Sequence, residues 1–191
     1  MYIKANIDDC ALIINDFLPN KLFEKIKNYN YEHDSSSYSY WSKGLYSDKN
    51  NFTTMKKVNV QQNIAVVKNG KIESEEDIFK EFLEILINCP FIPFQINSQI
   101  RISYYEYEKF SGINWHDDGQ HTLNYSFYIH DNWDKDWGGE TLIDTGRGLP
   151  LASYPIPNTL LAIKNNILHK VCPVTGPKKR KVLQVRGVFY E

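Results

Sequence analysis

The chain has 191 residues, a net charge of −1, an apolar fraction of 42% and a charged fraction of 24%. These values are typical of one globular domain and argue against a general electrostatic attraction to nucleic acid or to a membrane surface. Three cysteines without a CxxC pair argue against a disulfide framework or a thiolate zinc site. The sequence also contains neither a signal-peptide pattern nor an apolar run of the roughly 18 residues that a membrane span needs, so we expect a cytoplasmic protein without membrane contact.

The first part of the chain, residues 1–94, predicts a mixture of helices and strands. Residues 1–17 alternate and then run apolar, which is typical of one or two strands. Apolar residues at helical spacing predict an amphipathic helix from Lys21 and a longer one over 75–89, with a strand over 56–67 between them. Residues 30–54 are rich in Ser, Tyr and Asn, and we expect this long aromatic segment to form a flap over a functional site.

After residue 94, every segment has the pattern of a short strand. The predicted strands are 95–110, 122–130, 140–144, 159–164, 167–171 and 182–190. Helices followed by six to eight strands favour an α+β fold, a double-stranded β-helix (jelly roll) with supporting N-terminal helices. We therefore expect a single domain over residues 1–191, with the jelly-roll core at 95–191.

A His-x-Asp pair follows the first of these strands, and an isolated histidine lies in a later one. The residues are His116, Asp118 and His169. Alternate residues of an extended segment point the same way, so His116 and Asp118 converge while Asp117 points elsewhere. Two imidazoles and one carboxylate form the facial triad that binds Fe(II) and leaves positions open for a cosubstrate and O₂. Two alternatives remain, since His116 also fits a polar loop residue and His169 a core histidine.

The other three histidines have weaker patterns around them. His33 lies in the polar segment, His121 follows Asp118 closely, and His130 ends a predicted strand. We interpret them as surface or loop residues.

The last predicted strand begins with an arginine that could face the same interior. A buried guanidinium needs an anionic partner, and Arg180 could bind a dicarboxylic cosubstrate through two parallel hydrogen bonds. Alternatively, Arg180 belongs to the solvated basic cluster 177–181, or Lys179 takes the carboxylate in its place.

Several segments, in order and at fitting spacing, resemble the Fe(II)- and 2-oxoglutarate-dependent oxygenase superfamily, and within it the prolyl-4-hydroxylase-like branch. The resemblance covers residues 99–190, together with the opening segment 13–19. It is carried by the tyrosine strand at 101–107, the aromatic segment 127–133, the Trp-Gly-Gly-Glu-Thr-Leu segment at 137–142, the turn and strand at 154–164, and the segment 169–176 that precedes Arg180.

The resemblance implies an Fe(II) site formed by His116, Asp118 and His169. It implies that Arg180 pairs with the distal carboxylate of 2-oxoglutarate and that Tyr128 donates its hydroxyl to the same group. Tyr107, with Tyr105 as its rival, would line the cosubstrate pocket.

The implied activity is hydroxylation of an unactivated C–H bond, with O₂ and 2-oxoglutarate as cosubstrates and ascorbate as a further cofactor. The expected substrate is a prolyl or other amino-acid side chain in a protein, a peptide or a free amino acid. Substrate would enter over the barrel mouth, where Trp115, Arg186 and the flap could contact it.

The chain departs from the pattern of the branch at several points. Lys181-Val182 follows Arg180 where the branch often has x-Ser, Arg186 stands where it often has Trp, and the tyrosine strand lacks Tyr-x-x-Gly. The Arg180-x5-Arg186 spacing also resembles nucleic-acid dealkylases of the AlkB kind. A net charge of −1 argues against that alternative. A non-catalytic jelly-roll binding module is the remaining alternative.

Overall fold

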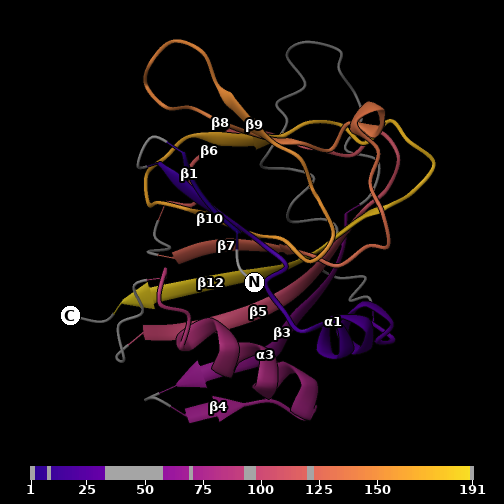
Figure 1. Ribbon diagram of the computed structural model, residues 1–191, viewed down its shortest axis with the longest axis vertical. Coiled ribbons are helices and arrows are strands. Elements are labelled where there is room, and N and C mark those ends of the chain that lie inside the picture. Colours follow the sequence, from indigo (N-terminus) through magenta and orange to yellow (C-terminus); the bar gives the residue numbers. More distant parts are fainter. Residues whose placement is uncertain are drawn as a thin grey trace.

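The computed structural model describes residues 3–7, 10–32, 58–68, 71–92, 98–119 and 123–189. Most of the predicted flap, including His33, lies outside these ranges, and so does His121. The described strands form two antiparallel sheets that face each other (Figure 1).

The larger sheet spans the middle of the molecule and contains strands from both parts of the chain. Its order is β1 (Ile3–Ile7), β2 (Ala11–Asn15), β10 (Leu160–Ile163), β7 (Leu123–Tyr128), β12 (Arg180–Phe189), β5 (Ser98–Tyr107), β3 (Val58–Lys68) and β4 (Lys71–Glu73). The N-terminal strands therefore extend both edges of the sheet, with β2 beside β10 and β3 beside β5.

The smaller sheet has the order β6 (Ile113–His116), β11 (His169–Val171), β8 (Thr141–Ile143) and β9 (Leu151–Ser153). The two facing sheets confirm the predicted α+β jelly roll. The sequence did not predict β6 and β9, because both are short and largely exposed and so lack a regular alternation of polar and apolar residues.

Two helices, α1 (Asn20–Lys27) and α3 (Asp77–Ile87), cover the face of the larger sheet that points away from the smaller one (Figure 1). Each helix buries one apolar stripe, as its sequence spacing predicted. Phe82 of α3 packs 5.3 Å from the ring of Phe127 on β7, and Phe17 packs 5.8 Å from the same ring. Each such buried aromatic side chain contributes about 1.5–3 kcal/mol, which fixes the sheet that carries the inner residues.

The space between the two sheets has an apolar part and a polar part. Tyr107, Ile143 and Val182 are among the buried residues of the apolar cluster there, whereas His169 and Arg180 are buried charged or polar groups. Alternation along β12 separates this space from the core under the helices, because Leu183 and Val185 face the helices while their neighbours face the smaller sheet.

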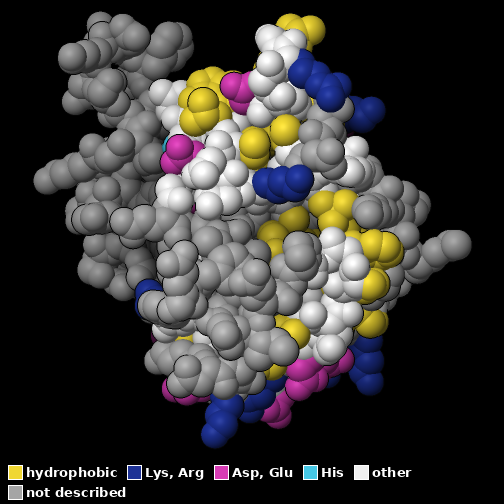
Figure 2. Space-filling view, turned by 90° about the vertical axis from the view of Figure 1, so that its left-hand side faces the viewer, with side chains coloured by type: hydrophobic (Ala, Val, Ile, Leu, Met, Phe, Trp, Pro, Cys, Tyr) yellow, Lys and Arg dark blue, Asp and Glu magenta, His cyan; other side chains and the backbone are white. Residues whose placement is uncertain are grey.

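Exposed apolar side chains lie along the smaller sheet and its loops. They include Trp115, Leu149, Leu151 and Leu168. Hydrophobic side chains lie beside Lys and Arg side chains in the upper part of the face in Figure 2. None of the helices in the described ranges is long and apolar enough to cross a membrane.

Candidate metal centre

Two histidines lie opposite each other on neighbouring strands of the smaller sheet. His116 of β6 and His169 of β11 are register partners, and their ring centroids are 4.4 Å apart. The Nδ1 of His116 lies 2.7 Å from the carbonyl oxygen of Asn114, and the Nδ1 of His169 lies 2.9 Å from that of Ile167. A carbonyl only accepts, so each Nδ1 carries the proton and each Nε2 keeps a lone pair for a metal ion.

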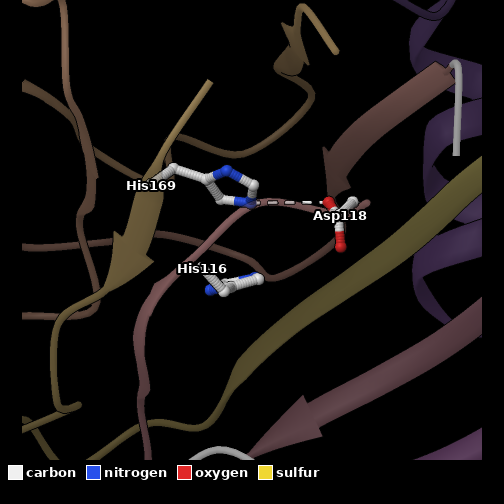
Figure 3. A group of neighbouring side chains, drawn as sticks. All are labelled: His116, Asp118 and His169. Atoms are coloured by element: carbon white, nitrogen blue, oxygen red, sulfur yellow. Dashed lines mark ion pairs between the residues drawn. The ribbon is translucent and has the colours of Figure 1, made fainter. Parts of the chain in front are cut away.

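Asp118 completes the group from the loop that follows β6. The ligand atoms of the three residues lie within 4.8 Å of one another, and Asp118 Oδ2 lies 3.5 Å from His169 Nε2 (Figure 3). With the Nδ1 proton on the opposite side of the ring, these two acceptor atoms face each other. The arrangement is stable when a proton or a metal cation lies between them.

The ionisation of the group suits a metal. Burial raises the pKa of Asp118, but the contact with His169 and the charge of Arg186 lower it more, to a final value of about 2. Burial, and then the neighbouring His169, lower the pKa of His116. Asp118 is therefore a carboxylate and His116 a neutral imidazole at neutral pH, as metal coordination requires.

A row of polar side chains on the larger sheet holds the Asp118 carboxylate from the other side. Asn124 of β7 donates from its amide to Asp118 Oδ2 and also lies 3.3 Å from His169 Nε2. Gln184 of β12 donates from its side-chain amide to Asn124 Oδ1, and its Oε1 accepts from the Ser126 hydroxyl at 2.9 Å. Sequence reasoning missed these residues, although alternation along β7 places Asn124 on the same face as Tyr128.

Arg186 holds the other oxygen of the same carboxylate. Its Nη2 lies 3.3 Å from Asp118 Oδ1, and its Nη1 donates to the Tyr105 hydroxyl at 3.2 Å. The sequence placed Arg186 at the mouth of the barrel. In the structure it lies directly beside the candidate metal ligands.

Arg180 lies deeper between the sheets and is only 1% exposed. Its Nη2 lies 3.5 Å from the Tyr128 hydroxyl and 3.3 Å from Thr141 Oγ1. The guanidinium carbon lies 4.8 Å from the Tyr107 ring centroid and 5.1 Å from that of Tyr128, and its Nε is buried without a hydrogen-bond partner. Within the described ranges, Arg180 pairs with hydroxyls and rings and with no carboxylate. A buried cation in these surroundings favours an anionic ligand.

The rival residues named from the sequence differ in their positions. Lys179 faces the outside, where its Nζ lies 2.6 Å from Glu106 Oε1 and 3.7 Å from Glu108 Oε1. Tyr105 and Tyr107 both line the interior, Tyr105 beside Arg186 and Tyr107 beside Arg180. Burial raises the pKa of Tyr107 to about 12, so its hydroxyl stays protonated and can donate.

The cavity between these groups has a volume of about 20 Å³, which is room for about one water molecule. Asp118, Arg180 and Arg186 are among the residues that line it. Two imidazoles and one carboxylate are a donor set that fits one metal ion.

His130 lies in the loop that follows β7, as interpreted from the sequence, but it is buried there and not at the surface. Only 4% of it is exposed, and its Nε2 donates to the Pro155 carbonyl oxygen at 2.5 Å. Its Nδ1 accepts from the Lys181 amide at 3.4 Å. Both ring nitrogens serve the structure of the loop that follows β7, away from the candidate metal ligands.

Comparison with known proteins gives a match to the family model of the 2OG-Fe(II) oxygenase superfamily over residues 102–185. A prolyl-4-hydroxylase from Pseudomonas putida is similar in structure at 13% identity, with a TM-score of 0.60 over 95% of this chain and 93% of that chain. A viral collagen prolyl hydroxylase from Paramecium Bursaria Chlorella virus-1, in a 2OG complex, is 14% identical, with a TM-score of 0.61 over 97% and 100% of the two chains. A prolyl hydroxylase from Trichoplax adhaerens, in complex with a hypoxia inducible factor peptide fragment, is 14% identical, with a TM-score of 0.57 over 93% and 83%. A search of curated protein sequences gave no match.

Proposed function

We propose that this chain, whose residues 102–185 match the family model of the 2OG-Fe(II) oxygenase superfamily, is a dioxygenase that hydroxylates an unactivated C–H bond in a prolyl or other amino-acid side chain. The substrate is a protein, a peptide or a free amino acid. The structural similarity to the prolyl hydroxylases, at 13% and 14% sequence identity, supports a shared fold alone, so the substrate class is part of the proposal.

The observation that carries this proposal is the pairing of a three-ligand group with a buried arginine that meets no carboxylate among the described residues. His116, Asp118 and His169 present two imidazole lone pairs and one carboxylate to one point. Arg180 presents a guanidinium deeper in the same cavity. A metal at the first place and a dicarboxylic 2-oxo acid reaching the second would satisfy both groups.

Each described residue then has a defined part. The two histidines and Asp118 would hold Fe(II) at the cavity that they line. Arg180 binds the distal carboxylate of 2-oxoglutarate, and the Tyr128 hydroxyl beside it donates to the same group. Tyr107 lines the pocket as a protonated phenol. Bound Fe(II) would supply O₂ activation coupled to the conversion of 2-oxoglutarate to succinate and CO₂.

We extend the proposal to the surroundings of the enzyme. Ascorbate serves as a reductant that keeps the iron in the Fe(II) state. The three cysteines, all within the described ranges, form no disulfide, which supports a reducing, cytoplasmic location. The described N-terminal and C-terminal strands share one sheet, which supports a single domain.

The test is succinate release from 2-oxoglutarate with Fe(II) and ascorbate, measured beside Mn(II)-dependent binding of 2-oxoglutarate. We expect slow uncoupled release in the wild type and none in Asp118→Ala. The matched control is Asp117→Ala, which removes the adjacent, exposed carboxylate that accepts from the Gly119 amide.

We expect Asp117→Ala to keep both binding and release. Absence of Mn(II)-dependent 2-oxoglutarate binding in the wild type would contradict the enzyme proposal and favour a non-catalytic jelly-roll module. Equal loss in both aspartate variants would contradict the assignment of Asp118 as the ligand.

A further inference from the structure

The inward face of the larger sheet carries more positive than negative charge. The inward positions of β5, β7 and β12 alternate with residues of the helix-covered core, and among those described they hold three arginines and no acidic residue. The arginines are Arg180, Arg186 and Arg101. In the part of the chain that the structure describes, Asp118 from the facing loop is the carboxylate that contacts this face.

Two of these arginines are direct neighbours across the sheet. Arg186 of β12 is the register partner of Arg101 of β5, so both side chains leave the same face at the same level. Like charges opposite each other destabilise a strand pair unless an anion lies between or beside them. Asp118 serves Arg186 in this structure, and Arg101 is an exposed residue.

Exposure shows which end of the row opens to solvent. Arg180 is 1% exposed, the Arg186 side chain is 18% exposed, and Arg101 is exposed. The row therefore runs from the closed end of the cavity to its mouth. A cosubstrate bound at Arg180 occupies the closed end, and a primary substrate approaches from the end where Arg186 and Arg101 lie.

Binding of the metal and the 2-oxo acid leaves the positive charge at the mouth less well neutralised. The three arginines and Asp118 sum to +2, and a divalent metal with a dianionic 2-oxo acid adds no net charge. Asp118 then shares its carboxylate with the metal and neutralises Arg186 less. A partly buried cation in this position favours an anionic partner.

From this charge distribution, which rests on the proposed function, we infer that the primary substrate carries a free carboxylate that binds Arg186 and Arg101. A small amino acid with a free α-carboxylate matches this chemistry. Arg186 then determines specificity in addition to holding Asp118. A prolyl residue within a folded protein offers no such group.

The test is substrate-stimulated succinate release, together with the gain of one oxygen atom by mass spectrometry. Free L-amino acids, including L-proline, are compared with their N-acetylated forms, their C-terminal amides and a single-stranded oligonucleotide. The variants are Arg186→Gln, Arg186→Lys and Arg101→Gln, with Lys181→Gln as the matched control, which removes one charge from the outer face of the same strand. Binding of the amino acid to the Mn(II)- and 2-oxoglutarate-loaded protein without O₂ gives a readout independent of turnover.

We expect stimulation by an amino acid with a free carboxylate and loss of stimulation by its amide. Charge-assisted hydrogen bonds predict a rise in KM and Kd of roughly tenfold to a hundredfold in Arg101→Gln and Arg186→Gln, with partial recovery in Arg186→Lys and no change in Lys181→Gln. A role of Arg186 limited to holding Asp118 would lower kcat and metal affinity and leave the preference for the free acid intact.

Three results would overturn the inference. They are equal use of the acid and its amide, stimulation by the oligonucleotide alone, and 2-oxoglutarate binding without stimulation by any free amino acid. Each of them leaves the oxygenase proposal standing. Absence of 2-oxoglutarate binding, in contrast, removes the proposed function and this inference together.

Discussion

Replacing Arg180 with methionine should make the ligand-free protein more stable and the cosubstrate complex weaker. Arg180 is buried, and its Nε has no hydrogen-bond partner. Its compensation within the described structure is two long hydrogen bonds to hydroxyls and two cation–π contacts. Replacing a buried ion pair by apolar residues of similar volume is neutral or stabilises a protein by about 1–4 kcal/mol, and we expect the same sign for a guanidinium that meets no carboxylate within the described structure. The cation–π contacts offset about 1 kcal/mol of this, so we expect a net gain of about 0–3 kcal/mol.

The loss in cosubstrate affinity follows from the same geometry. Two hydrogen bonds from Arg180 to a carboxylate contribute about 3 kcal/mol, which corresponds to roughly 150-fold in Kd. Binding of 2-oxoglutarate and of 2-oxopentanoate, which lacks the distal carboxylate, should be compared by titration in the presence of Mn(II). The wild type should prefer the dicarboxylate strongly, and Arg180→Met should bind both ligands with similar, low affinity.

Urea denaturation of the metal-free protein tests the other half of this prediction, with Lys178→Met as a control that removes an exposed lysine from the loop before β12. A loss of 2 kcal/mol or more in Arg180→Met would refute the reasoning, because it would show that the guanidinium is well compensated without a ligand. An unchanged preference for the dicarboxylate would refute the assignment of Arg180 to the distal carboxylate.

Three further predictions concern the pH dependence, a turn and the metal affinity. Burial lowers the pKa of His130 to about 4, below its unfolded value of about 6.5. The stability that neutral His130 contributes is therefore complete above pH 6.5 and is lost as the pH falls toward 4, by about 3 kcal/mol in total. His130→Gln should remove this part of the pH dependence of the unfolding free energy in urea titrations, and parallel curves for both proteins would contradict the prediction. Gly138 has φ +66°, and a Cβ there would lie 2.3 Å from the Pro173 carbonyl oxygen, so Gly138→Ala should lower the unfolding free energy by about 2–3 kcal/mol. Gly146 is the control, because nothing lies within 4 Å of a Cβ added there, and Gly146→Ala should cost only the strain of positive φ. Asn124→Leu should weaken Mn(II) binding by roughly tenfold to a hundredfold because Asp118 loses the amide that orients it; unchanged affinity by calorimetry would show that Arg186 and His169 suffice.

The sequence predicted the architecture well where periodicity was strong. The helix expected over 75–89 is α3 at Asp77–Ile87, and the strand expected over 95–110 is β5 at Ser98–Tyr107. It failed at β6, where Ile113–His116 is short and mostly exposed and is held by pairing with β11, more than fifty positions later. Local patterns contain no information on such long-range pairing.

The candidate ligands were predicted, but the residues around them were not. The spacing of His116 and Asp118, and one histidine in an apolar strand, pointed to the three side chains that the structure brings together. Asn124 has no motif of its own, and its role depends on the register of β7 against β12, which the sequence does not show. Arg186 appeared as a departure from the prolyl-4-hydroxylase-like pattern, and its contact with Asp118 became visible only in the folded structure.

The two sheets make different contributions to the site. The smaller sheet supplies both imidazoles as cross-strand neighbours, and their Nδ1 atoms are fixed by backbone carbonyls on the same strands or next to them. The larger sheet supplies the guanidinium groups and the amide of Asn124. Asp118 is the link, because it follows β6 in the chain yet contacts Asn124 and Arg186 on the opposite sheet. A metal bound to all three ligands would therefore connect the sheets through Asp118, and the arginines would set the charge of whatever binds beside it. Metal affinity and substrate charge are thus coupled through one carboxylate, which explains why an arginine rather than an aromatic residue at position 186 would change what the site accepts.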